Sequence, residues 1–97
     1  MAKHKKELTY VRGYFVELSE IEIVKTKEGL RQRATMTLET EDGQIIFLEI
    51  RDTIEFDKIE EFNLQPDDAL EVGFVFVGVK SFNKYFNNLH IKHLDLI

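Results

Sequence analysis

The chain has 97 residues, 43% of them hydrophobic, which is enough for one hydrophobic core and too few for two domains. It contains no cysteine, which excludes disulfides, thiolate zinc sites and a cysteine nucleophile. The formal net charge of −5 argues against a surface that is basic throughout, because contacts with phosphate need cations.

The N-terminal segment is basic, with Lys3, His4, Lys5 and Lys6, but it is not followed by the apolar segment of a secretory signal. No stretch approaches the roughly 18 apolar residues of a membrane-spanning helix. We therefore expect a cytoplasmic protein with no membrane association. Residues 1–8 are expected to form a flexible basic arm, and residues 9–97 a single folded domain.

Five segments in which polar and apolar residues alternate predict β-strands, and one segment with helical periodicity predicts a helix. The predicted strands are residues 10–25, 30–40, 44–51, 70–79 and 85–94, and the predicted helix is residues 54–63. Five strands with one helix between the third and the fourth is the order of an OB-fold, a small Greek-key barrel. The predicted fold class is therefore all-β with one short helix.

The first predicted strand is long, and Gly13 suits the bulge or sharp bend that lets one strand serve both sides of a small barrel. Its alternation changes phase at Ser19–Glu20. In the second strand, Ala34, Met36 and Leu38 are expected to face the core. The outward-facing residues are then Arg31 and Arg33 before this set and Thr35 and Thr37 within it.

A hairpin turn containing Asp42 and Gly43, expected to be of type I′, leads into the third strand. This strand is apolar on both faces, and we assign Ile46, Leu48 and Ile50 to the core. The outer face then carries Ile45, Phe47, Glu49 and Arg51. A register shift of one residue would instead bury Phe47.

Asp52 or Thr53 is expected to cap the N-terminus of the helix. Phe56, Ile59 and Phe62 recur at helical spacing and are expected to plug one end of the barrel. The other side of the helix should face solvent, because it carries Glu55, Asp57, Lys58, Glu60 and Glu61. Pro66 and the two aspartates after it predict a turn into the fourth strand.

The fourth strand is expected to place Leu70, Val72, Phe74 and Phe76 on its inner face. Val75 and Val77 would then face outward onto a second buried surface, formed by the helix, by the long first strand or by the partner in a homodimer. Residues 78–88 are expected to form a loop, and the fifth strand to place Leu89, Ile91 and Leu94 inward. His90 and His93 have an odd spacing and should point to opposite faces, which argues against a metal site.

Charge is segregated along the chain. Residues 49–72 carry nine acidic and two basic side chains, whereas residues 25–33 and 79–93 each carry a net charge of +3. This asymmetry predicts an acidic helix side and a basic groove. Patterning for solubility is the alternative, and charge alone does not decide between the two.

Two stretches resemble the C-terminal half of a family of small bacterial OB-fold proteins of uncertain function, usually grouped with single-stranded DNA-binding proteins. They read Leu64-x-Pro66-Asp67-Asp68-x-Leu70-x-Val72-x-Phe74 and Phe82-Asn83-x-x-Phe86-Asn87-Asn88-Leu89. Gly13-x-x-Val16 and the strand from Gly29 to Leu38 also fit this pattern. The resemblance implies nucleic-acid binding as the function.

Single strands are bound by a positive groove that follows the backbone and by aromatic rings on which bases stack. In an OB-fold the oligonucleotide face is formed by strands 2 and 3 and by the loops between strands 1–2 and 4–5. The candidate nucleic-acid-binding residues in those places are Lys25, Lys27, Arg31, Arg33, Phe47, Arg51, Lys80, Phe82, Lys84 and Tyr85. The alternative is that the arginines only pair with Glu39 and Glu49, and that Phe86 and Tyr85 belong to the core.

We therefore predict a protein of replication or repair that binds single-stranded DNA with weak sequence selectivity, and RNA would suit the same features. The alternative is a homodimeric interaction or assembly module without nucleic-acid binding. No glycine-rich phosphate loop, nucleophile elbow or zinc motif is present, so we predict no enzyme activity, no cofactor and no bound metal.

Overall fold

The structure is a computed structural model that describes residues 7–97. Most of the basic arm predicted at residues 1–8 lies outside the described residues. The described part contains six strands and one helix, in the order β1 (Thr9–Leu18), β2 (Glu22–Thr26), β3 (Gly29–Glu39), β4 (Ile45–Ile50), α1 (Thr53–Phe62), β5 (Ala69–Ser81) and β6 (Lys84–Leu96). No helix within residues 7–97 has the length and hydrophobicity needed to cross a membrane.

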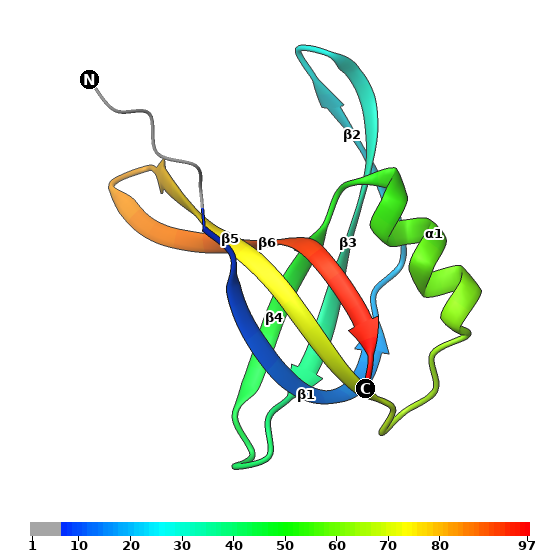
Figure 1. The fold of residues 1–97 in the computed structure, drawn as a ribbon. Helices are drawn as coiled ribbons and strands as arrows, with labels where there is room; N and C mark the ends of the chain where they lie inside the picture. Colours follow the sequence, from blue (N-terminus) through cyan, green and yellow to red (C-terminus); the bar gives the residue numbers. More distant parts are fainter. Residues whose placement is uncertain (1–6) are drawn as a thin grey trace.

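Five of the strands close into a ring in the order β1-β5-β6-β4-β3, because β1 pairs with both β5 and β3 (Figure 1). The pairs are antiparallel except β4–β6, which is parallel and joins Glu49 to His90. This is the strand order of an OB-fold, so the predicted barrel with one helix is confirmed. The helix lies between β4 and β5, which in chain order are the third and fourth of the five strands that form the ring.

The first predicted strand is wrong in one respect: it is two strands, separated at residues 19–21. The interruption has a local cause at Ser19. Its hydroxyl accepts a hydrogen bond from the Thr35 N–H (2.8 Å), and its own N–H donates to the Thr35 carbonyl (2.9 Å). A side chain that bonds to the neighbouring backbone in this way competes with the regular ladder. The count of strands therefore rises from five to six.

Gly13 lies where β1 crosses from β5 to β3. It is buried, and a Cβ atom there would lie 2.7 Å from the Glu39 carbonyl oxygen and 2.9 Å from Leu38 Cγ. The irregularity in the β1–β3 pairing lies slightly later, between Phe15 and Glu17. The glycine is therefore required for close approach of two backbones rather than as the bulged residue.

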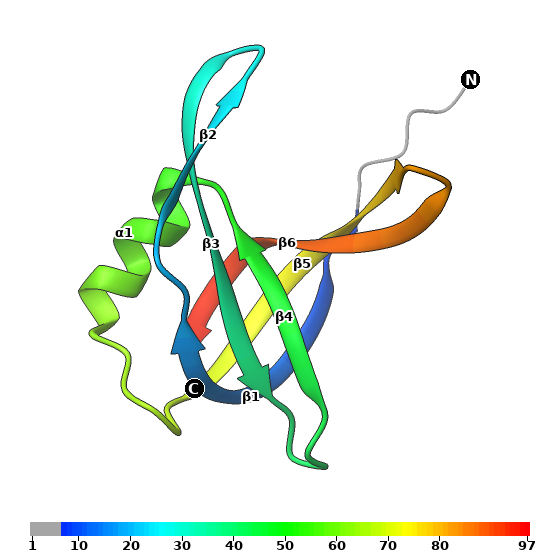
Figure 2. The same ribbon diagram turned by 180° about the vertical axis from the view of Figure 1, so that it is seen from behind.

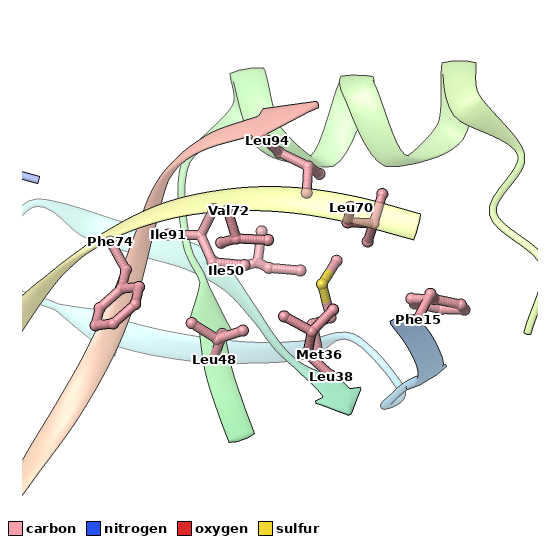
Figure 3. Packing of buried hydrophobic residues seen from close by; sticks show 10 residues of the cluster. All are labelled: Phe15, Met36, Leu38, Leu48, Ile50, Leu70, Val72, Phe74, Ile91 and Leu94. Carbon is pink, nitrogen blue, oxygen red and sulfur yellow. The ribbon is translucent and has the colours of Figure 1, made fainter. Parts of the chain in front are cut away.

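The core lies inside the ring and is made of side chains from every strand except β2 (Figure 3). Met36, Leu38, Leu48 and Ile50 are fully buried, as the alternation predicted. The predicted helix plug is also confirmed, because α1 packs Phe56, Ile59 and Phe62 against this core.

One expectation for the helix is wrong, and a second is correct for the position of the N-cap but not for its side-chain bond. Glu55 was expected in solvent and is buried, with only 5% of its surface exposed. Asp52 is the N-cap residue but makes no side-chain capping bond, because its carboxylate pairs instead with Lys92 at 2.9 Å. Asp57, Glu60 and Glu61 are exposed, and they form the acidic side of the helix.

Two hairpins project from the barrel (Figures 1 and 2). We call them the β2–β3 arm (residues 22–33) and the β5–β6 arm (residues 76–89). The second replaces the loop predicted at residues 78–88, because strand pairing continues to Ser81 and Lys84. Only Phe82 and Asn83 form the turn, both with positive φ (48° and 64°), as in a type I′ turn.

The turn between β3 and β4 also differs from the prediction. Gly43 has φ of 84°, but Asp42 does not have a positive φ, which a type I′ turn requires. The Thr40 N–H donates to the Gln44 carbonyl (2.9 Å), so three residues form the loop. The glycine alone takes the left-handed conformation.

Side-chain directions in β5 and β6 depart from simple alternation. The partner of Gly73 is His93 and that of Phe74 is Ile91, so Lys92 is an extra residue in β6. This bulge puts His90 and His93 on the same side of the strand, which corrects the prediction that they face apart.

The predictions of which β5 side chains face inward and which face outward are wrong in the same part of the strand. Phe76 was expected inside, but it is 56% exposed because the strands leave the barrel near this point and continue as the arm. Val75 was expected outside, but it is only 7% exposed. It is buried within the chain, so it does not support the expected homodimer surface.

Replacing Gly13 by alanine is expected to destabilise the protein by about 1–3 kcal/mol, because the new methyl group meets backbone that cannot move aside. Urea denaturation followed by circular dichroism measures the change. Gly78→Ala is the matched control, since a Cβ there makes only an ordinary contact of 3.6 Å with the Asn87 side chain. Equal stabilities of the two variants would contradict this account.

Candidate nucleic-acid interface

The outer face of β3 and β4 presents the side chains that the alternation predicted. Phe47 is opposite Thr37 and Glu49 is opposite Thr35 in the antiparallel pairing. Phe47 is 63% exposed, whereas its neighbour Leu48 is fully buried. The predicted register is therefore confirmed, and the alternative in which Phe47 belongs to the core is excluded.

A groove of about 830 Å³ lies over this face, between the two arms. We call it the arm groove, and Figure 2 shows β4 lying between the arms. One wall comes from the β2–β3 arm and the other from the β5–β6 arm. The residues that matter below are Glu22, Arg33, Phe47, Glu49, Arg51 and Phe86.

A second hollow of about 420 Å³ adjoins the arm groove beside the β2–β3 arm. Lys27 and Arg31 line it, and Arg51 lines both hollows. Arg31 also pairs loosely with Glu28 at 3.6 Å. The two hollows together give a track along which four of the predicted basic residues lie: Lys27, Arg31, Arg33 and Arg51.

The arginines of the arm groove are not free cations. Arg33 Nη2 lies 2.8 Å from Glu22 Oε2, and its Nε lies 3.4 Å from Glu49 Oε1. Arg51 Nη2 lies 3.3 Å from the same Glu49 oxygen. The hydrogen bond to Glu22, with the charge of Glu49, raises the pKa of Arg33 above its ordinary value. The expected pairing with Glu49 is present, whereas the partner on the arm is Glu22 rather than Glu39.

His90 completes this cluster from β6. Its Nε2 lies 2.8 Å from Glu49 Oε2, an ion-pair distance without the alignment of a hydrogen bond, and this buried atom has no hydrogen-bond partner in the described chain. Burial lowers the pKa of His90 below its ordinary 6.5; nearby Arg51 and Lys92 also lower it, and Glu49 opposes them. Within residues 7–97 no group of three or more side chains is arranged to hold a metal ion.

The β5–β6 arm divides the remaining predicted residues between two faces. Val79 is opposite Phe86, and both line the arm groove. Lys80 is opposite Tyr85 on the other face, with its ammonium 5.4 Å from the centre of the tyrosine ring. Lys80 and Tyr85 line a further hollow of about 330 Å³, which shares Val79, Phe86 and Asn87 with the arm groove.

The other predicted residues of the two arms lie at the edges of the site. Lys84 is opposite Ser81 and, by alternation, shares the face of Phe86. Phe82 is at the tip and 97% exposed. Lys25 is opposite Leu30, so alternation places it on the face of the β2–β3 arm away from Arg31 and Arg33.

The sequence offers Phe86 either as a stacking ring or as a core residue of the last strand and favours the core, which is wrong, because this ring is 47% exposed and lines the arm groove. The signal that identifies it is the two-residue turn at Phe82 and Asn83. Once that turn is fixed, counting back from it pairs Phe86 with Val79 on the groove side. The turn requires a positive backbone φ at Phe82, which bulky residues seldom adopt and which is often found at functional positions.

No protein-family model matches the chain, and no curated protein matches it. Solved structures do match. The mitochondrial single-stranded DNA-binding protein Rim1 from S. cerevisiae is 10% identical, with a TM-score of 0.66, over 96% of this chain and 97% of its own. The Plasmodium falciparum SSB in complex with ssDNA is 16% identical, with a TM-score of 0.53, over 100% and 97%.

Two further structures extend this result. The small single-stranded DNA-binding protein from Streptomyces coelicolor is 7% identical, with a TM-score of 0.52, over 98% of this chain and 96% of its own. The dimeric N-terminal domain of PriB from Thermoanaerobacter tencongensis is 9% identical, with a TM-score of 0.51, over 94% and 96%. At these identities the likeness establishes the fold. The expected resemblance to single-stranded DNA-binding proteins is thus confirmed for the architecture of the whole domain.

Stability is expected to fall as pH drops from about 6.5, because the unfolded chain then binds a proton at His90 that the folded protein resists. The contribution is complete above pH 6.5 and is lost as pH falls toward the lowered pKa. His90→Gln should therefore lose less stability between pH 7 and pH 5 than the unmodified protein, measured by urea denaturation. His93→Gln is the control, and parallel profiles for His90→Gln and the unmodified protein would contradict the assignment.

Proposed function

We propose that this protein binds single-stranded DNA along the arm groove. The observation that carries the proposal is the Phe47 ring, 63% exposed on the outer face of the barrel beside Arg33 and Arg51. A large apolar ring in water on a sheet surface gives up the stability that its burial would supply. Its place between two arms supports a role in holding a ligand with flat apolar faces.

In this proposal bases stack on Phe47 and on Phe86, at about 1–3 kcal/mol for each stacked base. The phosphates contact Arg33 and Arg51, and the strand continues past Arg31 and Lys27 through the adjoining hollow. Stacking tolerates every base, so sequence selectivity is weak. RNA offers the same rings and phosphates, and a competition between oligo-dT and oligo-U measures the preference.

The likeness to structures named as single-stranded DNA-binding proteins supports this function, since it extends over at least 96% of this chain and 95% of the matching chains. It favours a binding module over an enzyme. A role in replication or repair within the cytoplasm is the setting that we propose for it.

Phe47→Ala is expected to weaken binding of oligo-dT about tenfold and to leave the fold intact, because the exposed ring contributes stacking and little core packing. Fluorescence anisotropy with a labelled oligonucleotide at low salt measures the affinity, and circular dichroism checks the fold. Tyr10→Ala is the control, since it removes a similarly exposed ring on β1, outside the arm groove. Absence of oligonucleotide binding by the unmodified protein at low salt would overturn the proposal.

The second candidate function is assembly as a homodimer. The observation that favours it is the exposed face of β1, where Tyr10, Tyr14 and Val16 are 57%, 38% and 39% exposed, with Arg12 between the two tyrosines. Such a face on a strand usually lies against a partner. The PriB domain, described as dimeric, has the same fold.

Light scattering is expected to give the mass of two chains, and Val16→Asp is expected to return the mass of one, because a buried charge opposes association. Ile23→Asp, on the β2–β3 arm, is the matched control and should stay dimeric. A single-chain mass for the unmodified protein at all concentrations would contradict the dimer. The oligonucleotide titration then decides between a pure assembly module and a nucleic-acid-binding protein.

A further inference from the structure

Glu49 stands at the centre of the arm groove and is held there by the barrel itself. It faces outward from β4, opposite Thr35 of β3, and it forms the parallel pair with His90 that joins β4 to β6. Its side chain is only 13% exposed. The carboxylate therefore lies on the floor of the groove rather than moving freely in solvent.

Three positively charged or titratable groups converge on this one carboxylate. Arg33 Nε and Arg51 Nη2 lie 3.4 Å and 3.3 Å from Oε1, and His90 Nε2 lies 2.8 Å from Oε2. Arg33 is shared with Glu22, at 2.8 Å. A carboxylate between guanidinium groups takes the place that a phosphate oxygen would take, because both anions accept the same planar donors.

The charges that line the arm groove cancel. Arg33 and Arg51 provide two positive charges, and Glu22 and Glu49 provide two negative charges. A phosphate entering the groove therefore meets no net attraction from these four side chains. The phosphate can pair with one of these guanidinium groups only by displacing the carboxylate that is already paired with that group.

We propose that Glu49 is an internal competitor of the nucleic-acid backbone, which occupies Arg33 and Arg51 until a phosphate displaces it. The inference depends on the proposed function, because it concerns the same groove. Glu49 thereby sets the affinity of the groove below what its two arginines would give. A strand that contributes stacking as well as phosphates displaces the carboxylate, whereas a ligand that offers phosphate alone does not.

Glu49→Gln keeps the size of the side chain and removes its charge. Binding of oligo-dT at low salt is expected to tighten about fivefold, because the variant removes one negative charge that repels the bound phosphate. The dependence of log K on log salt should steepen by roughly 0.7 for each arginine released, up to about 1.4. Glu61→Gln is the matched control: it makes the same change in net charge on the exposed side of α1.

A second variant keeps the proposal testable if Glu49→Gln does not fold. Glu22→Gln releases Arg33 from a carboxylate that is 63% exposed on the β2–β3 arm, outside the core, and should also tighten binding. In an Arg33→Ala background the effect of Glu49→Gln is expected to shrink, because one of the two released cations is gone. The competition of inorganic phosphate with oligo-dT should be undetectable for the unmodified protein and appear for Glu49→Gln.

The outcomes separate the two proposals. Tighter binding and a steeper salt slope for Glu49→Gln, with Glu61→Gln unchanged, support the competitor. Unchanged or weaker binding for a folded Glu49→Gln, while the unmodified protein binds, overturns it and leaves the proposed function standing. If the unmodified protein does not bind at low salt, the proposed function fails, and the competitor, which depends on it, fails with it.

Discussion

The alternation of side chains along β3 and β4 is the constraint on which the rest of the molecule depends. The same two strands supply Ala34, Met36 and Leu48 to the core and Arg33 and Phe47 to the outer face. A slip of one residue would exchange the two sets, with a large loss of apolar burial. The core therefore fixes the floor of the arm groove, and side chains on it are presented to a ligand without further ordering of the backbone.

These two strands are also where the sequence was most informative. Ala34, Met36 and Leu38 alternate with charged and hydroxyl residues, so only one register buries the apolar set. The spacing of Phe56, Ile59 and Phe62 likewise admits a single buried helix face. In both cases one periodicity dominates over a whole element, and burial of apolar area then decides the structure.

The sequence was less informative where one extra residue in a strand shifts the alternation of the side chains that follow it. Ile91 and Leu94 are both buried because Lys92 is an extra, bulged residue between Ile91 and His93. Nothing in the sequence Ile-Lys-His-Leu identifies Lys92 as the bulged residue. The turn at Phe82 and Asn83 lacks the glycine that usually signals a type I′ geometry, so the sequence predicts a loop where the arm lies. The cluster at Glu49 joins Arg33, Arg51 and His90 through two different strand pairings, one of them the parallel closure of the barrel. Those contacts follow from three-dimensional closure and have no local signature.

In the proposed function, binding by this chain of net charge −5 draws its favourable free energy from more than charge. In the arm groove the arginines are paired before any ligand arrives, so a phosphate exchanges one anion for another and gains little Coulomb energy. Burial of the Phe47 and Phe86 rings against bases has no such competitor, because water is their only alternative contact. In the proposed function the groove therefore favours unpaired bases over a duplex, which presents phosphates but keeps its base faces stacked inside.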